Sequence, residues 1–333
     1  MIDILSYPLM QRAMLAALLT GIIAPAIGIY IVQRRLSLLG DGLGHVAIAG
    51  VGLALMTGQA PVPWAVAVCV AGAVAVEVLR QRGKATGDVG LAILFYGGLA
   101  AGVLMSGIAG QGAAALSQYL FGSLTTVTTA DLWVIVLLAV LVLVPTLGLA
   151  PQLFAVSTDE EFARTQGLRT SLYNILIVVL AAVTVTLAMR TVGLLLVSAL
   201  MVVPVAAAQN LVRGFYAALV AAMAVGVVVT VGGAVGSFYL DTPPGALIVV
   251  LAIAVFALSW PFSAMIARRR RVAPVLPELV DDDTLNLHTE VPESHPHRHG
   301  PDCEHPTIRH GDHTDYVHEG HRHASHGDHY DEH

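Results

Sequence analysis

Charged residues are scarce in this chain. Asp, Glu, Lys and Arg make up 12% of its 333 residues, whereas ordinary soluble domains contain roughly 25%. Hydrophobic residues account for 56%. Several runs of about 20 residues contain no charge, which is the length needed to cross about 30 Å of hydrocarbon. The shortage of charge therefore excludes a soluble globular protein and predicts a multi-pass membrane protein.

Cysteines and catalytic motifs are also few or missing. The two cysteines, Cys69 and Cys303, lie in very different surroundings, which excludes a disulfide framework and a zinc knuckle. No glycine-rich loop is followed by Lys and Ser or Thr, so ATP chemistry has to come from a partner. No paired-aspartate motif, His-Glu-x-x-His or nucleophile arrangement occurs, which argues against an intramembrane enzyme.

Charge and histidine divide the chain into two parts. From Asp281 onward there are 13 acidic and 3 basic residues, a net charge of −10, while the remainder has 10 acidic and 14 basic residues, a net charge of +4. Of the 14 histidines, 13 lie at or after His288. We therefore expect an all-α transmembrane bundle over residues 1–270 and a disordered, acidic, histidine-rich tail over residues 271–333.

Nine apolar stretches are long enough to be membrane-spanning helices. They cover residues 12–33, 41–58, 61–79, 89–107, 131–149, 172–189, 191–209, 214–236 and 244–266. Only Arg190 separates two of them, so eight spans is the alternative count. With nine spans, the basic clusters at 34–35, 80–84, 164–169 and 268–271 share one side, which predicts a cytoplasmic tail and an external amino terminus.

Asp41 and His45 are polar residues in an apolar run, and His45 is the only histidine within residues 1–270. Residues four apart on a helix share a face. A charge at membrane depth costs at least ~2.5 kcal/mol. A divalent metal ion would offset that cost, because carboxylate and imidazole suit zinc, manganese or ferrous iron. A two-fold homodimer would supply two of each ligand, enough for a tetrahedral ion.

A structural role is the alternative for this pair. Asp41 lies near the start of its helix, where a capping residue belongs. His45 would then make a hydrogen bond that serves packing alone. The spacing leaves both interpretations open.

The charged connection over residues 151–171 has the features of a docking helix. Thr158 and Glu161 have the spacing of a capping box, and Gly167 is placed to end the helix. Phe162 adds one large apolar side chain suited to a groove on a cytosolic partner; an ordinary solvated connection is the alternative. The residues assigned to partner binding are Asp159, Glu160, Glu161, Phe162, Ala163, Arg164 and Gly167.

Four segments resemble the membrane subunits of bacterial zinc and manganese ABC importers. RRLSLLGDGLGHVAIAGVGLA (34–54) is similar to that family's Arg-x-x-Ser-Leu-x-Gly-Asp-x-x-x-His signature. The others are LSQYLFGSLTTVTTADL (116–132), STDEEFARTQGL (157–168) and VGLLLVSALMVVPVAAA (192–208). The resemblance covers most of residues 5–266. It implies a permease of the type II-like ABC importer fold in the bacterial plasma membrane, a transport subunit that hydrolyses nothing itself.

The resemblance also implies a set of partners. Two cytosolic ABC ATPase subunits would dock on the helix within 158–167, and an extracytoplasmic metal-binding protein would deliver the ion. A second permease subunit would form a homodimer or a close heterodimer. Asp41 and His45 align with the family's gate ligands, with Zn²⁺ or Mn²⁺ as transported substrate and no permanently bound cofactor. Apart from membrane lipid we expect no further partner class, and no nucleic acid.

The tail repeats histidines in His-x-His pairs. They are His295, His297 and His299, then His321 and His323. Imidazoles flanked by acidic residues are loose zinc ligands, so we expect several weak sites and a preference for zinc. The hypothesis is a segment that buffers or senses incoming zinc. The alternative is a solvated extension without a role.

Two other transporter classes compete with this interpretation. A proton-driven zinc exporter would normally take four ligands from two helices of one chain, whereas here the remaining acidic residues, Glu77, Asp88, Asp131 and Asp241, lie at span ends. A permease for organic metal chelates would share the broad architecture. A requirement for ATP would distinguish an ABC importer from a proton-driven exporter. Competition between free zinc or manganese ions and a chelate would distinguish a permease for free ions from a permease for chelates.

Overall fold

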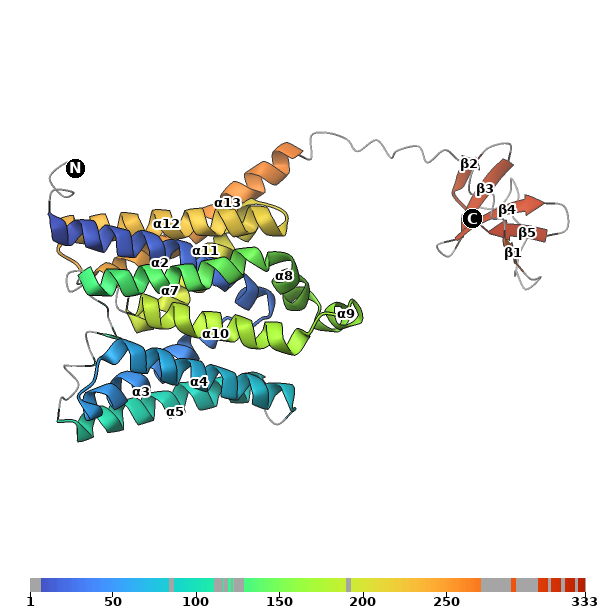
Figure 1. Ribbon diagram of the computed structural model, residues 1–333. Helices are drawn as coiled ribbons and strands as arrows, with labels where there is room; N and C mark the ends of the chain where they lie inside the picture. Colours follow the sequence, from blue (N-terminus) through green and yellow to red (C-terminus); the bar gives the residue numbers. More distant parts are fainter. Residues whose placement is uncertain are drawn as a thin grey trace. The chain divides into compact units, whose positions relative to one another are not determined.

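The structure is a computed structural model with two units, residues 1–269 and 270–333. It describes residues 7–83, 87–110, 116, 119–120, 122, 129–189 and 193–270, and in the C-terminal region 289–291, 305–310, 313–318, 321–326 and 329–332. His295, His297 and His299 lie outside these residues. The described first unit is helical and the second holds β-strands (Figure 1).

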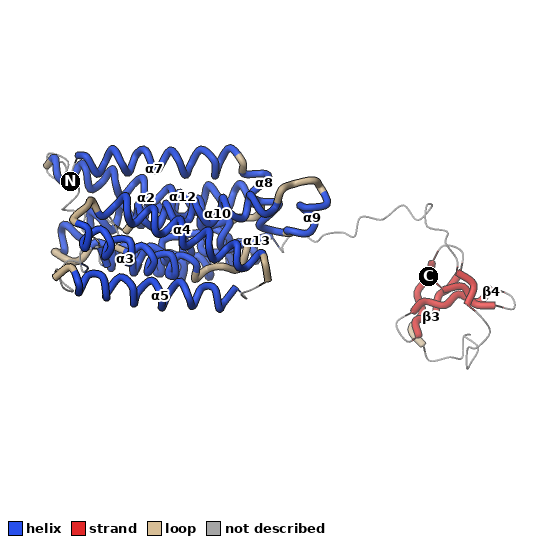
Figure 2. Tube along the Cα trace, turned by 60° about the horizontal axis from the view of Figure 1, so that its bottom comes forward, coloured by secondary structure: helices blue, strands red, loops and turns tan. Residues whose placement is uncertain are grey.

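Long helices lie side by side in the first unit (Figures 1 and 2). They are α2 (Pro8–Gln33), α3 (Leu39–Thr57), α4 (Pro61–Gln81), α5 (Gly87–Ile108), α7 (Thr129–Gly148), α10 (Thr170–Ala188), α11 (Leu194–Leu211), α12 (Phe215–Leu240) and α13 (Pro244–Arg270). Two short helices, α8 (Ala150–Thr158) and α9 (Glu160–Thr165), lie together at one end of the bundle. The all-α transmembrane bundle expected from the sequence is confirmed.

Proline and glycine set several helix ends. Pro8, Pro61 and Pro244 each stand at the first position of a helix, where the missing N–H of proline removes no intrahelical bond. Gly58 ends α3 with a φ of 67°, a left-handed conformation that side chains with a Cβ rarely adopt. These ends lie within four residues of those predicted from the sequence.

The number of spans differs from the nine predicted. By length and composition, the described residues contain seven helices that can cross a membrane, or eight if α7 and α8, bent by 72°, form one span. The predicted span 191–209 corresponds to α11, which begins only after Gly193, a residue with a φ of 93°. The helix itself is 18 residues long, Leu194–Leu211. The upper count of eight among the described residues equals the alternative count from the sequence.

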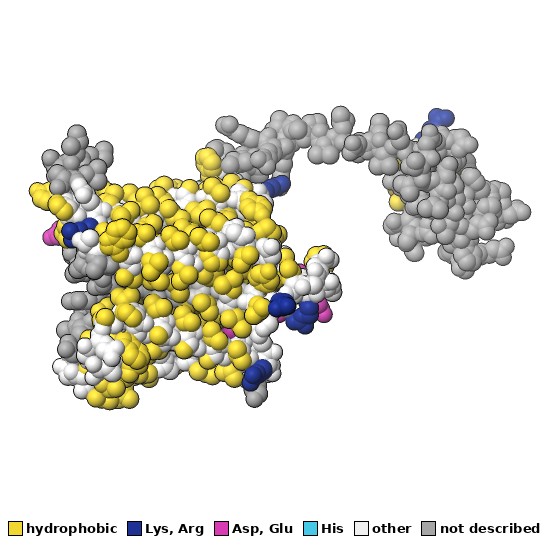
Figure 3. Space-filling model, viewed as in Figure 1, with side chains coloured by type: hydrophobic (Ala, Val, Ile, Leu, Met, Phe, Trp, Pro, Cys, Tyr) yellow, Lys and Arg dark blue, Asp and Glu magenta, His cyan; other side chains and the backbone are white. Residues whose placement is uncertain are grey.

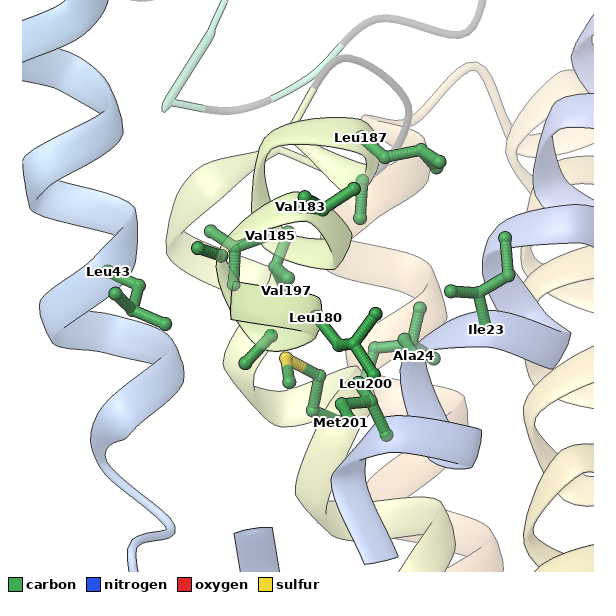
Figure 4. Close-up of a cluster of buried hydrophobic side chains, with 14 of the residues drawn as sticks. Ile23, Ala24, Leu43, Leu180, Val183, Val185, Leu187, Val197, Leu200 and Met201 are labelled. Carbon is green, nitrogen blue, oxygen red and sulfur yellow. The ribbon is translucent and has the colours of Figure 1, made fainter. Parts of the chain in front are cut away.

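The core lies around α3, the most buried of the span-length helices. It contacts α4, α5, α10 and α11. Leu43 of α3 belongs to a cluster with Leu180 of α10, Met201 of α11 and Ile23 of α2 (Figure 4). Helix α5 approaches closely because Gly98 lies against the backbone of residues 45–46. This packing fixes the helix that carries the candidate ligands.

The outer surface of the bundle is apolar. In Figure 3 hydrophobic side chains cover its side, and the Lys and Arg side chains in view lie at the ends of the helices. Large residues such as Tyr96, Trp133 and Val228 are exposed. Exposed apolar residues over this breadth suit contact with lipid rather than water.

The second unit contains an antiparallel sheet in the order β1–β5–β4–β3–β2. The strands are β1 (Thr289–Val291), β2 (Thr307–His310), β3 (His313–His318), β4 (His321–His326) and β5 (His329–Glu332). These strands lie within residues 271–333, the segment for which the low content of large apolar residues predicts disorder. The signal for strands is local, because connections of two residues with one glycine, at 311–312, 319–320 and 327–328, are typical of β-hairpins.

Replacing Gly98 by alanine should destabilise the bundle. A Cβ there would lie 2.6 Å from the carbonyl carbon of His45 and the nitrogen of Val46, so α3 and α5 would have to separate. We expect Gly98→Ala to cost about 1–3 kcal/mol and to lower the midpoint of thermal unfolding in detergent. Gly97→Ala makes the same change one residue away, where a Cβ meets nothing within 4 Å. Equal midpoints for the two variants would contradict the prediction.

Candidate metal site and docking helix

Asp41 lies in the first turn of α3, and a residue of α11 orients its side chain. The Ser198 hydroxyl donates a hydrogen bond of 2.5 Å to Asp41 Oδ1. The capping residue of α3 is Leu38, which makes no side-chain hydrogen bond, so Asp41 does not cap the helix as the structural alternative required. A hydroxyl that fixes a carboxylate in this way is a common outer-sphere partner of a metal ligand.

His45 is buried one turn further along α3, with 7% of its surface exposed. Its ring packs edge-on against Phe95 of α5, with ring centroids 4.0 Å apart. Nδ1 is buried and has no hydrogen-bond partner among the described residues. The packing hydrogen bond of the structural alternative is therefore not seen at this nitrogen. Leaving a buried polar atom unpaired costs about 1–3 kcal/mol, which a bound ligand would recover.

A cavity of about 290 Å³ reaches Asp41 between α3 and α5. Its lining residues are Leu38, Asp41, Gly42, Leu91, Ala92, Phe95 and Tyr96. Leu38 and Tyr96 are largely exposed, so the cavity opens at the surface of the subunit. Among the described residues, no group of three or more His, Cys, Asp or Glu could hold a metal ion. Within the part of the chain that the structure describes, Asp41 and His45 are therefore two candidate ligands without a third, and the cavity beside Asp41 is open at the surface of the subunit.

The predicted docking helix is present as α9, capped at both ends. Asp159, not Thr158, is its N-cap, and its side chain accepts a hydrogen bond of 2.9 Å from the Phe162 N–H. The capping-box prediction is wrong because Thr158 is still the last residue of α8. Gly167 ends the helix with a φ of 83°, and the N–H groups of Gly167 and Leu168 bond back to the carbonyls of Arg164 and Ala163. These two hydrogen bonds cap the C-terminal end of α9, so α9 is a short helix with both ends fixed.

The predicted partner-binding residues of α9 fall on two faces. Phe162 is 60% exposed, and Glu161 and Arg164 are also exposed. Ala163 is buried, so it anchors the helix and offers no contact surface. Beside α9, a cavity of about 430 Å³ is lined by Gly167, Leu168, Arg169, Leu172, Tyr173 and Leu176. The exposed aromatic ring and the adjoining hollow together suit a protein partner.

Glu77 connects several helices at the end of the bundle where α9 lies, a role that was not predicted from the sequence. Its buried carboxylate accepts hydrogen bonds of 2.9 and 2.7 Å from Arg80 and lies 3.5 Å from Arg34, the residue that follows α2. Arg80 also lies 3.8 Å from Glu160 of α9. Burial lowers the pKa of the Arg34 guanidinium, and the charge of Glu77 opposes that shift. The spacing of Glu77, Arg80 and Gln81 on one helix face was the available signal.

Gln81 extends the same set of contacts to α10. Its amide donates a hydrogen bond of 3.0 Å to Glu77 and accepts one of 2.6 Å from Ser171. The carboxyl ends of α2 and α4, helix α9 and the start of α10 therefore meet at one end of the bundle. Three of the predicted basic clusters contribute to that end, through Arg34, Arg80 and Arg164. Of the tail ligands predicted from sequence, His321 and His323 lie on β4 of the second unit.

Comparison with known proteins identifies the family. Residues 6–263 match the ABC 3 transport family. A "Probable metal transport system membrane protein" of Treponema pallidum is 35% identical over 76% of this chain and 95% of its own length. The "Manganese transport system membrane protein MntC" of Halalkalibacterium halodurans is 33% identical over 78% and 89%.

A solved structure shows the same arrangement of helices. "PsaBC from Streptococcus pneumoniae in complex with Fab" superimposes with a TM-score of 0.71 at 26% identity, over 78% of this chain and 94% of the other. The apolar helices and the permease relatives agree on a multi-pass membrane protein. The chain therefore belongs to the ABC 3 transport family, as a permease subunit of metal ABC importers.

Proposed function

We propose that this permease carries Zn²⁺ or Mn²⁺ through a site that Asp41 and His45 form with the same residues of a second copy. The observation that carries the proposal is the buried, unpaired Nδ1 of His45 one turn from Asp41. A carboxylate and an imidazole on one helix face are a suitable pair of ligands, and the cavity at Asp41 opens at the surface of the subunit. A two-fold axis doubles the pair to four ligands.

Zinc is the ion that the rest of the chain favours. Two carboxylates and two imidazoles accept either zinc or manganese, so the membrane pair does not choose between them. The relative from Halalkalibacterium halodurans is named for manganese. The tail, however, has 13 histidines, and imidazole favours zinc over manganese. This composition supports zinc as the principal substrate.

We also propose that two cytosolic ATPase subunits drive transport by docking on α9 of each permease, and that an extracytoplasmic protein delivers the ion. Support comes from the exposed Phe162 on a helix capped at both ends. The contacts of Arg80 and Gln81 connect α9 and α10 to α4, which packs on α3. A displacement of α9 would therefore be transmitted through these contacts to α3, the helix that carries Asp41 and His45.

The tail is proposed to bind zinc on the cytosolic side and to slow uptake when internal zinc rises. His295, His297, His299, His321 and His323 were assigned to this role from the sequence. Support comes from the concentration of imidazoles next to carboxylates, which bind zinc reversibly.

Substitution at the membrane pair should abolish transport of the preferred ion. We expect Asp41→Asn and His45→Ala to stop ATP-driven uptake of zinc-65 or manganese-54 into vesicles that contain the permease and its ATPase. Ser198→Ala removes the hydrogen bond that orients Asp41, and should weaken ion affinity by about 10- to 100-fold. Asp241→Asn is the matched control, since asparagine tolerates the left-handed conformation at this exposed position. Unaltered uptake in the Asp41 and His45 variants, or uptake without ATP, would overturn the proposal.

Replacing Phe162 by alanine should weaken binding of the ATPase to the permease. Phe162→Ala removes the large exposed side chain of α9 while leaving its caps intact, so less ATPase should copurify with the permease and ion-stimulated hydrolysis should fall. Phe238→Ala, a similarly exposed phenylalanine near the far end of α12, is the control. If both variants retain the same amount of ATPase, α9 is not the docking element.

Removal of residues 285–333 should relieve inhibition by internal zinc. Initial zinc uptake would be measured with and without zinc on the tail side of the membrane. We expect the truncated permease to keep its full rate under both conditions, and manganese uptake to be the same for both chains because imidazole binds manganese weakly. Zinc inhibition that survives the truncation would contradict a sensing role.

A further inference from the structure

Phe95 of α5 lies between the cavity at Asp41 and the side chain of His45. Asp41 and Phe95 both line the cavity of about 290 Å³, whereas His45 is not among its described lining residues. The Phe95 ring packs edge-on against the His45 ring, with the ring centroids 4.0 Å apart. An ion that entered the cavity would therefore meet Asp41 and an aromatic ring before it could meet the imidazole.

The contact between the two rings is close. Aromatic pairs usually have their ring centroids about 4.5–7 Å apart, so the Phe95 ring leaves no space for an ion on its side of His45. The imidazole has 7% of its surface exposed, and its Nδ1 is buried without a hydrogen-bond partner among the described residues. A nitrogen that could bind an ion is thus kept apart from the cavity through which an ion would reach Asp41.

Separation of α3 from α5 is not an easy way to expose His45. After Phe95 along α5, Gly98 and Gly102 lie directly against the backbone of α3, at residues 45–46 and 48–49. Before it, Leu94 lies against Gly42 of α3, where an added Cβ would be 3.3 Å from the Leu94 Cβ. Close-packed interfaces of this kind deform little. A change that opens His45 to the cavity therefore has to come from the Phe95 side chain.

The cavity gives the Phe95 ring a place to turn into. An apolar cavity of about 150 Å³ can accept benzene, and this one measures about 290 Å³, with Leu91, Ala92 and Tyr96 in its lining. Phe95 is only half-buried, and a change of rotamer moves its ring without moving the backbone. Such a turn would uncover the imidazole for an ion that is already beside Asp41.

We propose that Phe95 is a positioning residue that covers His45 and turns aside when an ion binds, so that the imidazole joins Asp41 only in the turned state. The inference rests on the metal site proposed for Asp41 and His45, and it adds how that site opens. A covered ligand lowers the apparent affinity by the fraction of molecules that are uncovered. A residue that only supported His45 would loosen the imidazole when shortened and so weaken binding. The two roles therefore predict effects of opposite sign.

The test is the affinity for Mn²⁺ of variants at Phe95. Manganese-54 is bound at equilibrium to the permease with its ATPase in detergent, without ATP, because the tail imidazoles bind manganese weakly. We expect Phe95→Ala to tighten binding by about 3- to 10-fold, since one aromatic contact no longer has to be broken. Phe95→Trp, with a larger ring, should weaken binding. Phe95→Leu should give a smaller gain, and it provides the test if the alanine variant does not fold.

Two controls separate covering from other effects. Ile93→Ala shortens an exposed residue of the same helix outside the cavity lining, so affinity should stay the same. In a chain that also carries His45→Ala, Phe95→Ala should bring no gain, because the ring acts through the imidazole. Weaker or unchanged binding in Phe95→Ala, or an equal gain without His45, would overturn the proposal.

Asp41→Asn distinguishes the two possible failures. If this variant still binds Mn²⁺ as the unaltered chain does, the metal site itself is wrong. If it loses binding while Phe95→Ala gains none, the metal site stands and only the role of Phe95 is refuted.

Discussion

A polar group inside hydrocarbon has to find its partner within the protein, and this requirement determines where the chemistry of the subunit lies. The helices satisfy their own backbone. Glu77 is satisfied by Arg34 and Arg80, and Asp41 receives the hydroxyl of Ser198. His45 Nδ1 lacks such a partner among the described residues. The cation that we propose to be transported would fit this place, because it would satisfy the carboxylate and the imidazole together and then leave.

The same requirement links the membrane site to the end of the bundle where α9 lies. Breaking a buried ion pair by removing one partner costs about 3–5 kcal/mol. The contacts around Glu77 therefore resist separation, and α2 and α4 should move together at that end. Arg80 reaches α9 and Gln81 reaches α10, so these elements are included in the same connected unit. Because α4 packs directly on α3, a displacement of α9 need pass through few contacts to reach Asp41.

The sequence could identify what is local and missed what is distant. Asp41 and His45 stand out because their polarity and spacing are visible within one helix, and α9 because charged residues interrupt an apolar pattern. Ser198 lies 157 residues from Asp41 in the chain, so only tertiary packing brings it close. The sequence could not decide between eight and nine spans, because a bend such as that between α7 and α8 has no charge to mark it. The tail strands were missed because their signal lies in short glycine connections rather than in apolar alternation.

In the proposed membrane site each subunit would provide half of the ligands, so relative movement of the two subunits would divide the coordination shell and release the ion. Ligands that part during each transport cycle suit translocation.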